Sequence, residues 1–249
     1  HNRLHAADVL QATSLLARQR RVYEALDDVA TVALLFAAMI HDFRHPGKNE
    51  KFLVASSDPL AVRYSDDSTL ERMHLAEAFE LLREESNDFL AAVSAETRRT
   101  FRSIAIQCVL ATDLARSRHY LNVFQGHRDA TAFADDDSLP AKISLCTVII
   151  KVADVSHPLR ARDRHLAWSK RILREFFHQG DDERLKGLPI SPLCDANDLD
   201  VPKAQRGFID FVCKPIFTAF YDFCIDDDKP PSDDDDDDDD ESTKDDLSS

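Results

Sequence analysis

The sequence contains little glycine: only 5 of its 249 residues are of this type. Long stretches are instead rich in Ala, Leu, Arg and Glu, which favour helices over sheets. No apolar run reaches the roughly 18 residues that a membrane span needs, and no signal peptide is visible. We therefore expect an all-α protein with no membrane span in this chain.

Cysteines are few, widely spaced and odd in number. Such a set does not form the disulfide framework of a small secreted protein, and it lacks the paired spacing of a zinc ribbon. We expect reduced thiols in a cytoplasmic protein, at Cys108, Cys146, Cys194, Cys213 and Cys224.

Positive charge is also scarce. The formal net charge is −15, but residues 226–249 hold 14 acidic residues and 2 lysines, which leaves a net charge of only −3 for residues 1–225. This mildly acidic part lacks the basic stripe that binding to nucleic acid needs. Residues 1–225 are long enough for one large domain. The acidic run cannot bury a core, so it predicts a disordered, solvated tail that would repel anions, aid solubility or bind a basic partner.

The first indication of a functional site lies in residues 32–52, VALLFAAMIHDFRHPGKNEKF. The apolar run is typical of a helix that is buried on all sides, yet it continues directly into His41 and Asp42. An imidazole and a carboxylate are costly to bury unless something pairs with them, and a divalent metal ion pairs with both. The break that follows keeps His45 near the same place. For these residues alone, a capped core helix with a chance His-Asp pair is the alternative.

Two further pairs of polar residues have helical spacing. His1 and His5 lie one turn apart, so both imidazoles can converge on one point. Glu71 and His74 lie three residues apart on one face of another expected helix. Surface histidines and a surface ion-pairing face are the ordinary alternatives for these two pairs.

Residues 143–154, ISLCTVIIKVAD, repeat the pattern of an apolar run that ends in an acid. Periodicity alone does not distinguish a strand from a helix here, and we expect a helix because every neighbouring segment is helical. Two imidazoles and two carboxylates would form a mixed set suited to Zn, Fe or Mn, with one carboxylate free to bridge to a harder Mg or Mn. Two such ions can activate a hydroxide and neutralise a phosphoryl group, which predicts a phosphohydrolase. The expected ligands are His5, His41, Asp42 and Asp154.

Local signals also predict where some helices begin and end. They indicate helices at residues 29–41 and 94–120, a helix N-cap at Ser65 or Asp66, an internal loop at 126–140, an amphipathic helix at 168–179 with Gly180 as its C-cap, a loop at 188–202, and a last helix at 205–223 that Pro215 breaks or kinks.

Taken together, the motifs resemble the class I cyclic nucleotide phosphodiesterases. They occur in the order of that family and span nearly the whole chain up to residue 225: HNRLHAADV at 1–9, HDFRHPG at 41–47, LERMHLAEAF at 70–79, ATDL at 111–114, VADVSHP at 152–158, EFFHQGDDE at 175–183, GLPISPLCD at 187–195 and QRGFIDF at 205–211. The resemblance implies an all-helical, HD-type catalytic domain that hydrolyses the 3′ ester bond of cAMP or cGMP to give the 5′-monophosphate.

The resemblance also implies a role for each residue of the metal site. The ligands of a tighter ion, usually Zn, would be His5, His41, Asp42 and Asp154. Asp42 would bridge to a second ion, usually Mg, whose water shell would be held by His45, Glu71 and Thr112. A hydroxide between the two ions would attack phosphorus, and His1, oriented by Glu71, would protonate the departing O3′.

Further positions match the nucleotide pocket of the family. Gln205 would hydrogen-bond the edge of the base, while Phe208 and Ile172 would clamp its two faces, although both are also ordinary packing residues. His157 replaces the Asn that is common in cAMP-selective members. With GLPISPLCD at 187–195, this position looks more like the calmodulin-stimulated subfamily, which accepts both nucleotides, and whose calmodulin-binding region would lie upstream.

Several positions depart from the pattern of the family. Glu50 stands where the family has Asn, and Met73 stands where it has the first of two histidines. The chain starts at His1, without the Tyr that normally precedes this motif, so we expect the N-terminal helices to be missing. Two alternatives stay open: another HD-type phosphohydrolase, acting for example on nucleoside triphosphates, and a non-catalytic nucleotide-binding module.

Overall fold

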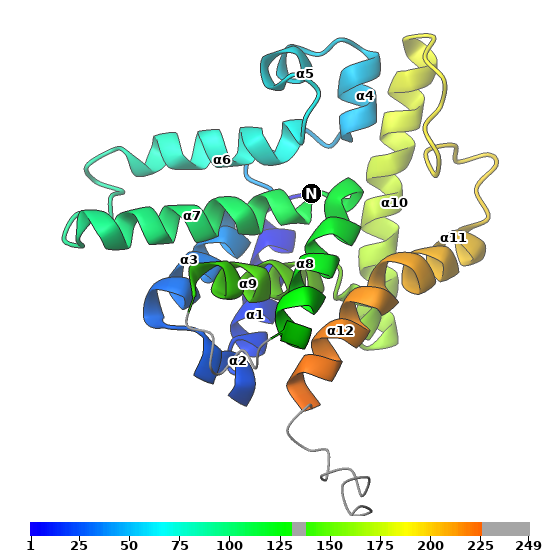
Figure 1. Cartoon of the computed structure of the whole chain (residues 1–249). Coiled ribbons are helices and arrows are strands. Elements are labelled where there is room, and N and C mark those ends of the chain that lie inside the picture. Colours follow the sequence, from blue (N-terminus) through cyan, green and yellow to red (C-terminus); the bar gives the residue numbers. More distant parts are fainter. Residues whose placement is uncertain (131–137, 226–249) are drawn as a thin grey trace, which may run out of the picture.

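The computed structural model describes residues 1–130 and 138–225, and all regular elements in these ranges are helices (Figure 1). This confirms the expected all-α class. No helix within the two ranges is long and apolar enough to cross a membrane. Residues 131–137 of the expected loop and the acidic tail at 226–249 lie outside the described residues, so a domain boundary at residue 225 stays a prediction.

The elements follow one another along the chain in this order: α1 (Arg3–Leu16), α2 (Arg20–Ala25), α3 (Asp28–Ile40), α4 (Glu50–Ala55), α5 (Pro59–Tyr64), α6 (Thr69–Leu82), α7 (Ala95–Thr112), η1 (Leu114–Arg116), α8 (Ser117–Ala130), α9 (Leu139–Asp154), η2 (His157–Leu159), α10 (Arg162–Leu185), α11 (Val201–Phe208), η3 (Ile209–Cys213) and α12 (Lys214–Ile225).

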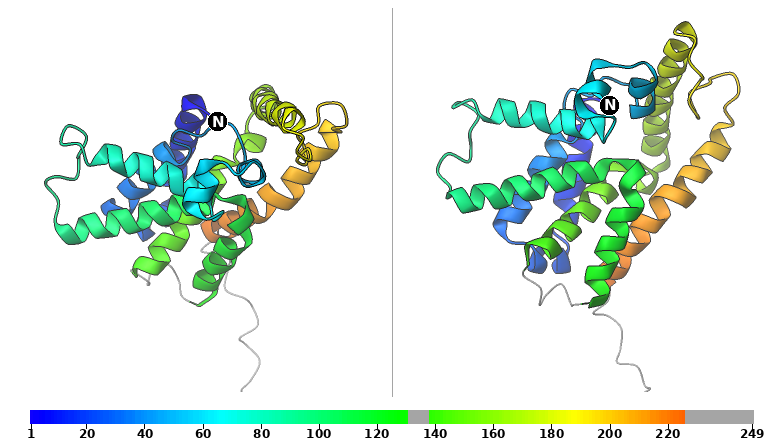
Figure 2. Two further views of the ribbon diagram at one scale, coloured as in Figure 1. Left: turned by 90° about the horizontal axis from the view of Figure 1, so that it is seen from above. Right: turned by 45° about the horizontal axis from the view of Figure 1, so that its top comes forward.

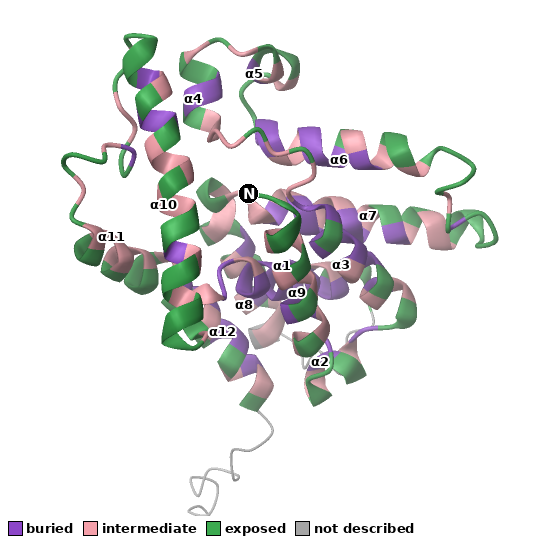
Figure 3. Ribbon diagram, turned by 180° about the vertical axis from the view of Figure 1, so that it is seen from behind, coloured by how far each residue is buried: buried purple, intermediate pink, exposed green. Residues whose placement is uncertain are grey.

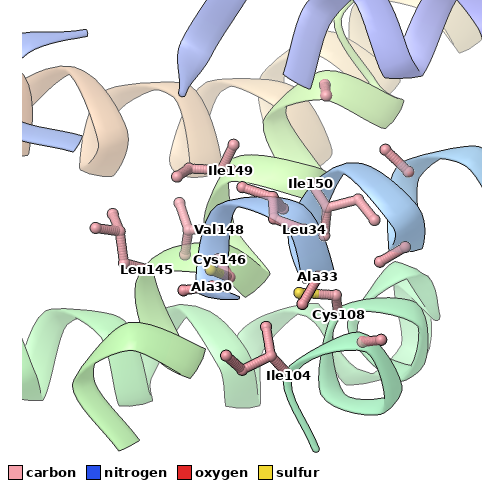
Figure 4. Close-up of a cluster of buried hydrophobic side chains, with 14 of the residues drawn as sticks. Ala30, Ala33, Leu34, Ile104, Cys108, Leu145, Cys146, Val148, Ile149 and Ile150 are labelled. Carbon is pink, nitrogen blue, oxygen red and sulfur yellow. The ribbon is translucent and has the colours of Figure 1, made fainter. Parts of the chain in front are cut away.

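Helices α3 and α9 form the centre of the fold. Helix α3 packs against α1 and α7, and α9 packs against α1, α7 and α8. Figure 4 shows Leu34 of α3 among Cys146, Ile149 and Ile150 of α9, as the apolar sequences of both helices predict. Figure 2 shows α10 and α11 on the opposite side of this core from α6 and α7. In Figure 3 burial is concentrated in the central helices, whereas exposed residues alternate with intermediate and buried ones along α10.

Helix α9 is a helix and not a strand, as we expected from its neighbours. It begins after Ser138, whose side chain accepts a hydrogen bond from the N–H of Ala141. Lys151 is 3% exposed, and its Nζ donates to the carbonyl oxygen of Ala111 at 2.5 Å. A buried ammonium group needs a hydrogen-bond acceptor. This bond supplies one, and it joins the C-terminal turn of α9 to the end of α7.

The start of α6 differs from the expectation. The N-cap is Ser68 and not Ser65 or Asp66, and its φ of 46° lies in the left-handed region. In that conformation the hydroxyl of Ser68 donates to Asp113 Oδ2 at 2.8 Å and does not cap its own helix. Glu50 instead accepts the N–H of Thr69 at 2.8 Å. Glu50, which departs from the family pattern, therefore caps α6 although it lies far from this helix in the sequence. Local sequence signals do not reveal such a cap.

Gly180 does not end α10, which continues to Leu185. Its role is steric: a Cβ at position 180 would lie 2.0 Å from the carbonyl oxygen of Cys194. The loop after α10 therefore packs directly on the helix backbone. Gly126 likewise lies inside a helix, α8, and not in the expected loop.

A buried polar network fastens the same part of α10 to two loops. Gln179 Nε2 donates to Glu183 Oε1 at 2.9 Å, and Gln179 Oε1 accepts the N–H of Asn49 at 2.8 Å. Glu183 also accepts the N–H of Ser191 at 2.7 Å and its hydroxyl at 2.6 Å. The segment before α4 and the segment before α11 are thus held on one helix.

The last helical stretch is interrupted, as Pro215 led us to expect. Helix α11 ends at Phe208, a π-helical turn covers Ile209–Cys213, and α12 begins at Lys214. Pro215 lies just after this turn, and because it has no N–H it removes one hydrogen bond from the continuous helical backbone. The π-helical turn lies where that bond is lost.

We predict that Gly180→Ala lowers the free energy of unfolding by more than the roughly 1–3 kcal/mol typical of an overpacked side chain, because the added Cβ meets backbone. Gly126→Ala is the matched control, since nothing lies within 4 Å of its Cβ position in α8. We expect this control to gain about 0.5–1 kcal/mol from helix propensity. Urea denaturation of both variants measures the difference, and equal stability would contradict the close approach of Cys194.

Candidate active site

Three core helices bring the expected metal ligands to one point. His5 lies in α1, His41 and Asp42 directly follow α3, and Asp154 is the last residue of α9. His5 Nε2 lies 3.0 Å from Asp154 Oδ1 and 3.4 Å from Asp42 Oδ2. His41 Nε2 lies 3.2 Å from Asp42 Oδ2, 3.4 Å from Asp154 Oδ1 and 3.3 Å from His5 Nε2. Residues that are up to 149 positions apart in sequence thus form one cluster.

A hydrogen bond on the side of the ring away from the cluster fixes the orientation of His41. Its side chain is 1% exposed, and its Nδ1–H donates to the carbonyl oxygen of Ala38 at 2.9 Å. Nε2 therefore points into the cluster. This is the arrangement that metal-binding histidines use, because the second nitrogen fixes the tautomer and the ring.

The electrostatics of the cluster favour an added cation. Burial would raise the pKa of Asp42, but the neighbouring His41 outweighs it and lowers the pKa well below its ordinary value. Burial would lower the pKa of His41, but Asp42 and Asp154 raise it well above its ordinary value. Asp42 Oδ2 is nevertheless buried without a hydrogen-bond donor. A metal ion would supply the missing positive charge in place of the imidazole protons.

The distances also fit a metal ion. Ligand atoms bound to one ion at about 2.0–2.2 Å lie roughly 3.0–3.5 Å from one another, and the five separations given above are between 3.0 and 3.4 Å. His5, His41 and Asp42 form a group that could hold an ion. The residues present therefore fit a divalent metal, while the assignment of all four as ligands stays a prediction.

Asp42 also faces a second group of possible ligands. Its Oδ1 lies 3.9 Å from Nε2 of His74, and the ligand atoms of Asp42, His45 and His74 lie within 4.8 Å of one another. The Nδ1–H of His74 donates to the carbonyl oxygen of Phe43 at 2.6 Å, so Nε2 is free to face Asp42. His74 was not among the expected ligands, although its helical spacing from Glu71 was a signal for it.

The residues expected around a second ion come from three elements: the loop after α3, α6 and the end of α7. Burial lowers the pKa of His45 to about 3, and its Nδ1 accepts the N–H of Gly47 at 3.0 Å. Burial, together with neighbouring carboxylates, raises the pKa of Glu71 to about 7. The hydroxyl of Thr112 donates to the carbonyl oxygen of Val109 at 2.7 Å, which leaves its oxygen able to accept. Their contact with a water shell stays a prediction.

His1 contacts Glu175 in the structure, whereas the partner expected from the resemblance was Glu71. Nδ1 of His1 forms a hydrogen bond with Glu175 Oε1, although 174 positions separate the two residues. Burial would lower the pKa of His1, but this hydrogen bond and the charges of Asp42 and Glu175 raise it to about 9. Glu71 faces other carboxylates instead. Glu175 is part of the EFFHQGDDE segment, but nothing in its local spacing points to His1.

The residues expected to bind a nucleotide lie beside α10. The ring of His157 is parallel to that of Phe208, with centroids 5.6 Å apart, and its Nδ1 lies 3.0 Å from Nδ1 of His165. The hydroxyl of Ser169 donates to Gln205 Oε1 at 3.1 Å. Ile172 is half-buried one helical turn further along α10.

Trp168 connects these residues to the metal cluster. Its ring lies 5.8 Å from that of His5, edge to face. Nothing in the sequence marks Trp168, Ser169 and Glu175 as site residues, because this part of α10 has the pattern of an ordinary amphipathic helix.

Met73 occupies the place of the histidine that is absent from the family pattern. Its side chain is 5% exposed and packs in a small apolar cluster with Phe52, Leu53, Ala61 and Leu70. Compared with the family pattern, an apolar side chain that packs in this cluster thus replaces a polar one. His74 still lies next to Asp42.

We predict that Zn²⁺ stabilises this protein and that Asp154→Asn removes most of the effect. An ion present at about 100 times its dissociation constant adds about 2.7 kcal/mol to the free energy of unfolding. Thermal unfolding with and without added Zn²⁺ measures the gain, and mass spectrometry after gel filtration measures the bound metal. Asp163→Asn, an exposed change in the first turn of α10, is the control. Equal stabilisation of all three proteins would refute the assignment of Asp154.

The chain is similar to known proteins along most of its length. The family model for 3′5′-cyclic nucleotide phosphodiesterase matches residues 1–231. The chain is 37% identical over 232 residues to a probable 3′,5′-cyclic-AMP phosphodiesterase, pde-4, of Caenorhabditis elegans, which covers 91% of this chain and 34% of that protein.

Two mammalian relatives are similar to a comparable degree. The chain is 38% identical over 223 residues to the dual specificity calcium/calmodulin-dependent 3′,5′-cyclic nucleotide phosphodiesterase 1C of Mus musculus and of Rattus norvegicus. The match covers 89% of this chain, and 31% and 28% of the two relatives. The chain thus spans about a third of the length of the curated relatives it matches. Because the family model matches nearly the entire chain, this chain belongs to the 3′,5′-cyclic nucleotide phosphodiesterase family.

Proposed function

We propose that this chain hydrolyses the 3′ phosphoester bond of cAMP and cGMP to give the 5′-monophosphates. The observation that carries the proposal is the convergence of two imidazoles and two carboxylates next to the proposed nucleotide residues on α10 and α11. Membership of the family supports the same reaction. The four residues proposed to hold a first ion, Zn, are His5, His41, Asp42 and Asp154, and Asp42 would bridge to a second ion, Mg or Mn.

When bound, the two ions would neutralise the phosphoryl oxygens and activate a water for attack. His45, Glu71 and Thr112 would hold water molecules around the second site. The pKa of Glu71, about 7, allows this carboxyl group both to donate and to accept a hydrogen bond near neutral pH.

His1 is proposed to protonate the departing O3′. The contact with Glu175 uses Nδ1, so the proton on Nε2 is available to the substrate. With a pKa of about 9, the ring carries that proton throughout the neutral range. A general acid needs to be protonated and within hydrogen-bond reach of the leaving oxygen. Glu175 supplies the first condition and helps to fix the second.

Gln205 is proposed to bind the edge of the base, between Phe208 on one side and Ile172 on the other. A hydroxyl both donates and accepts, so Ser169 can support either orientation of the Gln205 amide. The amide can therefore present its oxygen or its nitrogen to the base, which supports acceptance of both adenine and guanine. His157, which is parallel to Phe208, would extend the wall of this pocket.

Regulation and location are part of the same proposal. Two similar proteins are named as calcium/calmodulin-dependent, and this chain spans about a third of their length. We therefore propose that regulatory segments, including a calmodulin-binding one, lie outside residues 1–225, which would form the catalytic domain. All five cysteines are free, which supports action in the reducing cytoplasm.

The direct test is a substrate panel with Zn²⁺ and Mg²⁺ supplied. We expect 5′-AMP from cAMP and 5′-GMP from cGMP, and no release of phosphate or triphosphate from nucleoside triphosphates. His1→Gln should reduce kcat by about 10²–10⁴-fold, the usual contribution of a general acid, and retain its metal content. Turnover of triphosphates alone would identify another phosphohydrolase, and binding of cAMP without turnover would identify a non-catalytic module.

The pH dependence tests the role of Glu175. Because the raised pKa keeps His1 protonated at neutral pH, activity should fall only as pH rises through about 9. Glu175→Gln removes a carboxylate that favours the imidazolium, so the pKa of His1 should fall and the alkaline limb of kcat/KM should move to lower pH. Glu77→Gln, which affects an ion pair with Arg44, is the control. An unchanged alkaline limb in Glu175→Gln would show that this pair does not set the acid.

A further inference from the structure

The outer side of α10 carries a cluster of unpaired positive charges. Arg164, Lys170, Arg171 and Arg174 are all exposed, and we call them the basic face. Within the described residues, none of them forms an ion pair, and the recorded contact of Arg171 is with the ring of Trp168, 4.8 Å from its centroid. Figure 3 shows how much of α10 is open to solvent.

The other end of the same helix is different. Asp181 pairs with Arg184 at 3.1 Å, and Asp182 pairs with Lys48 from the loop after α3. The charges near the C-terminus of α10 are therefore matched within the fold, whereas those of the basic face are not.

An unmatched cluster of this kind is unfavourable for the helix. Lys170 and Arg174 lie four residues apart, and Arg171 and Arg174 lie three apart, so like charges are neighbours on the surface. Residues 162–174 contain five cations and one acid, although residues 1–225 as a whole carry a net charge of −3. The net charge of residues 1–225 does not reveal this local excess of positive charge. An anionic partner would reduce the repulsion among these cations.

The chain itself contains a segment of matching charge. The tail at 226–249 follows α12 and includes eight consecutive aspartates at 233–240. The aspartates at 233–240 lie 8 to 15 residues beyond Ile225, and at no more than about 3.5 Å per residue such a span reaches roughly 28–53 Å. Helix α10, with 24 residues, is only about 36 Å long at 1.5 Å per residue. The span available to the aspartate run is therefore comparable with the length of the helix, and a flexible tether of this kind gives an effective concentration in the millimolar range.

We propose that the aspartate run at 233–240 binds the basic face of α10 within the same molecule. The attraction is between a run of eight carboxylates and four exposed cations, so it depends on opposite charge and not on a fixed set of contacts. Such an interaction depends strongly on ionic strength, because exposed charges are screened by salt.

The position of the basic face gives this contact a consequence, which rests on the proposed function. The same helix carries Trp168, Ser169 and Ile172 on its inner side. A bound tail would hold carboxylates beside the proposed nucleotide pocket. The substrate is an anion, so the tail would oppose its approach and raise KM at low salt without changing the chemical step.

Zero-length cross-linking of the full chain tests the binding. A carbodiimide joins a carboxylate to a lysine amine only when the two groups touch, and Lys170 is the reporter. Lys186, exposed at the other end of the same helix, is the internal control. We expect peptides that link Lys170 to the aspartate run within one molecule, an excess over Lys186, and loss of these links in about 1 M salt, where the screening length falls to about 3 Å.

Two variants separate specific binding from chance contact. Replacing Arg164, Arg171 and Arg174 by Gln keeps the reporter and the helix propensity, and it should reduce linkage at Lys170 while leaving linkage at Lys186 unchanged. Equal linkage of Lys170 and Lys186 in the unaltered chain would overturn the proposal. Links found only between different molecules would overturn it as well.

A kinetic measurement tests the consequence separately. Replacing the eight aspartates at 233–240 by Asn should lower KM for cAMP at low salt, leave kcat unchanged, and remove the difference in KM between low and high salt. If the unaltered chain shows no turnover, the proposed function fails while the cross-links still report the contact. An unchanged KM in an active protein that retains the links would overturn only the effect on the substrate.

Discussion

The cost of holding ionised carboxylates between packed helices governs this structure. Removing a charge from water costs several kcal/mol even after relaxation, yet α3 and α9 are mostly buried and each has an acid at or near its C-terminal end. Asp42 and Asp154 are tolerated there because His5 and His41 meet them at the same point. The apolar packing of the helices offsets the cost, and the cluster in turn requires that three helix ends converge.

Much of this could be predicted from the sequence, because the signal was local. A buried apolar run that ends in an ionisable residue is visible without knowledge of the fold, and it identified His41, Asp42 and Asp154. The helical class followed from composition. Contacts between distant segments were not visible in this way. The pairing of His1 with Glu175 depends on the course of α10, and the resemblance to the family indicated Glu71 instead.

The glycine and capping signals predicted the wrong helix ends, because these ends also depend on contacts between distant segments. Gly180 was interpreted as a helix end from its neighbours, whereas it is required by the backbone of Cys194 packing on α10. The N-terminus of α6 was placed too early because its cap is Glu50, which belongs to another helix. Glu50 and Met73 are also departures from the family pattern. In both cases the new side chain has a structural partner, so the differences are accommodated around the ligand cluster and leave its donor atoms in place.

Helix α10 carries Ser169, which contacts Gln205, and Glu175, which contacts His1. These two anchors lie six positions apart, and the rise of an α-helix makes that about 9 Å along the helix axis. Under the proposed function, helix α10 therefore fixes the distance between the end of the site that recognises the base and the end that protonates the leaving oxygen. This fixed distance selects ligands by their length. A ligand that is much shorter or longer than one nucleotide could engage one anchor, but not both at once.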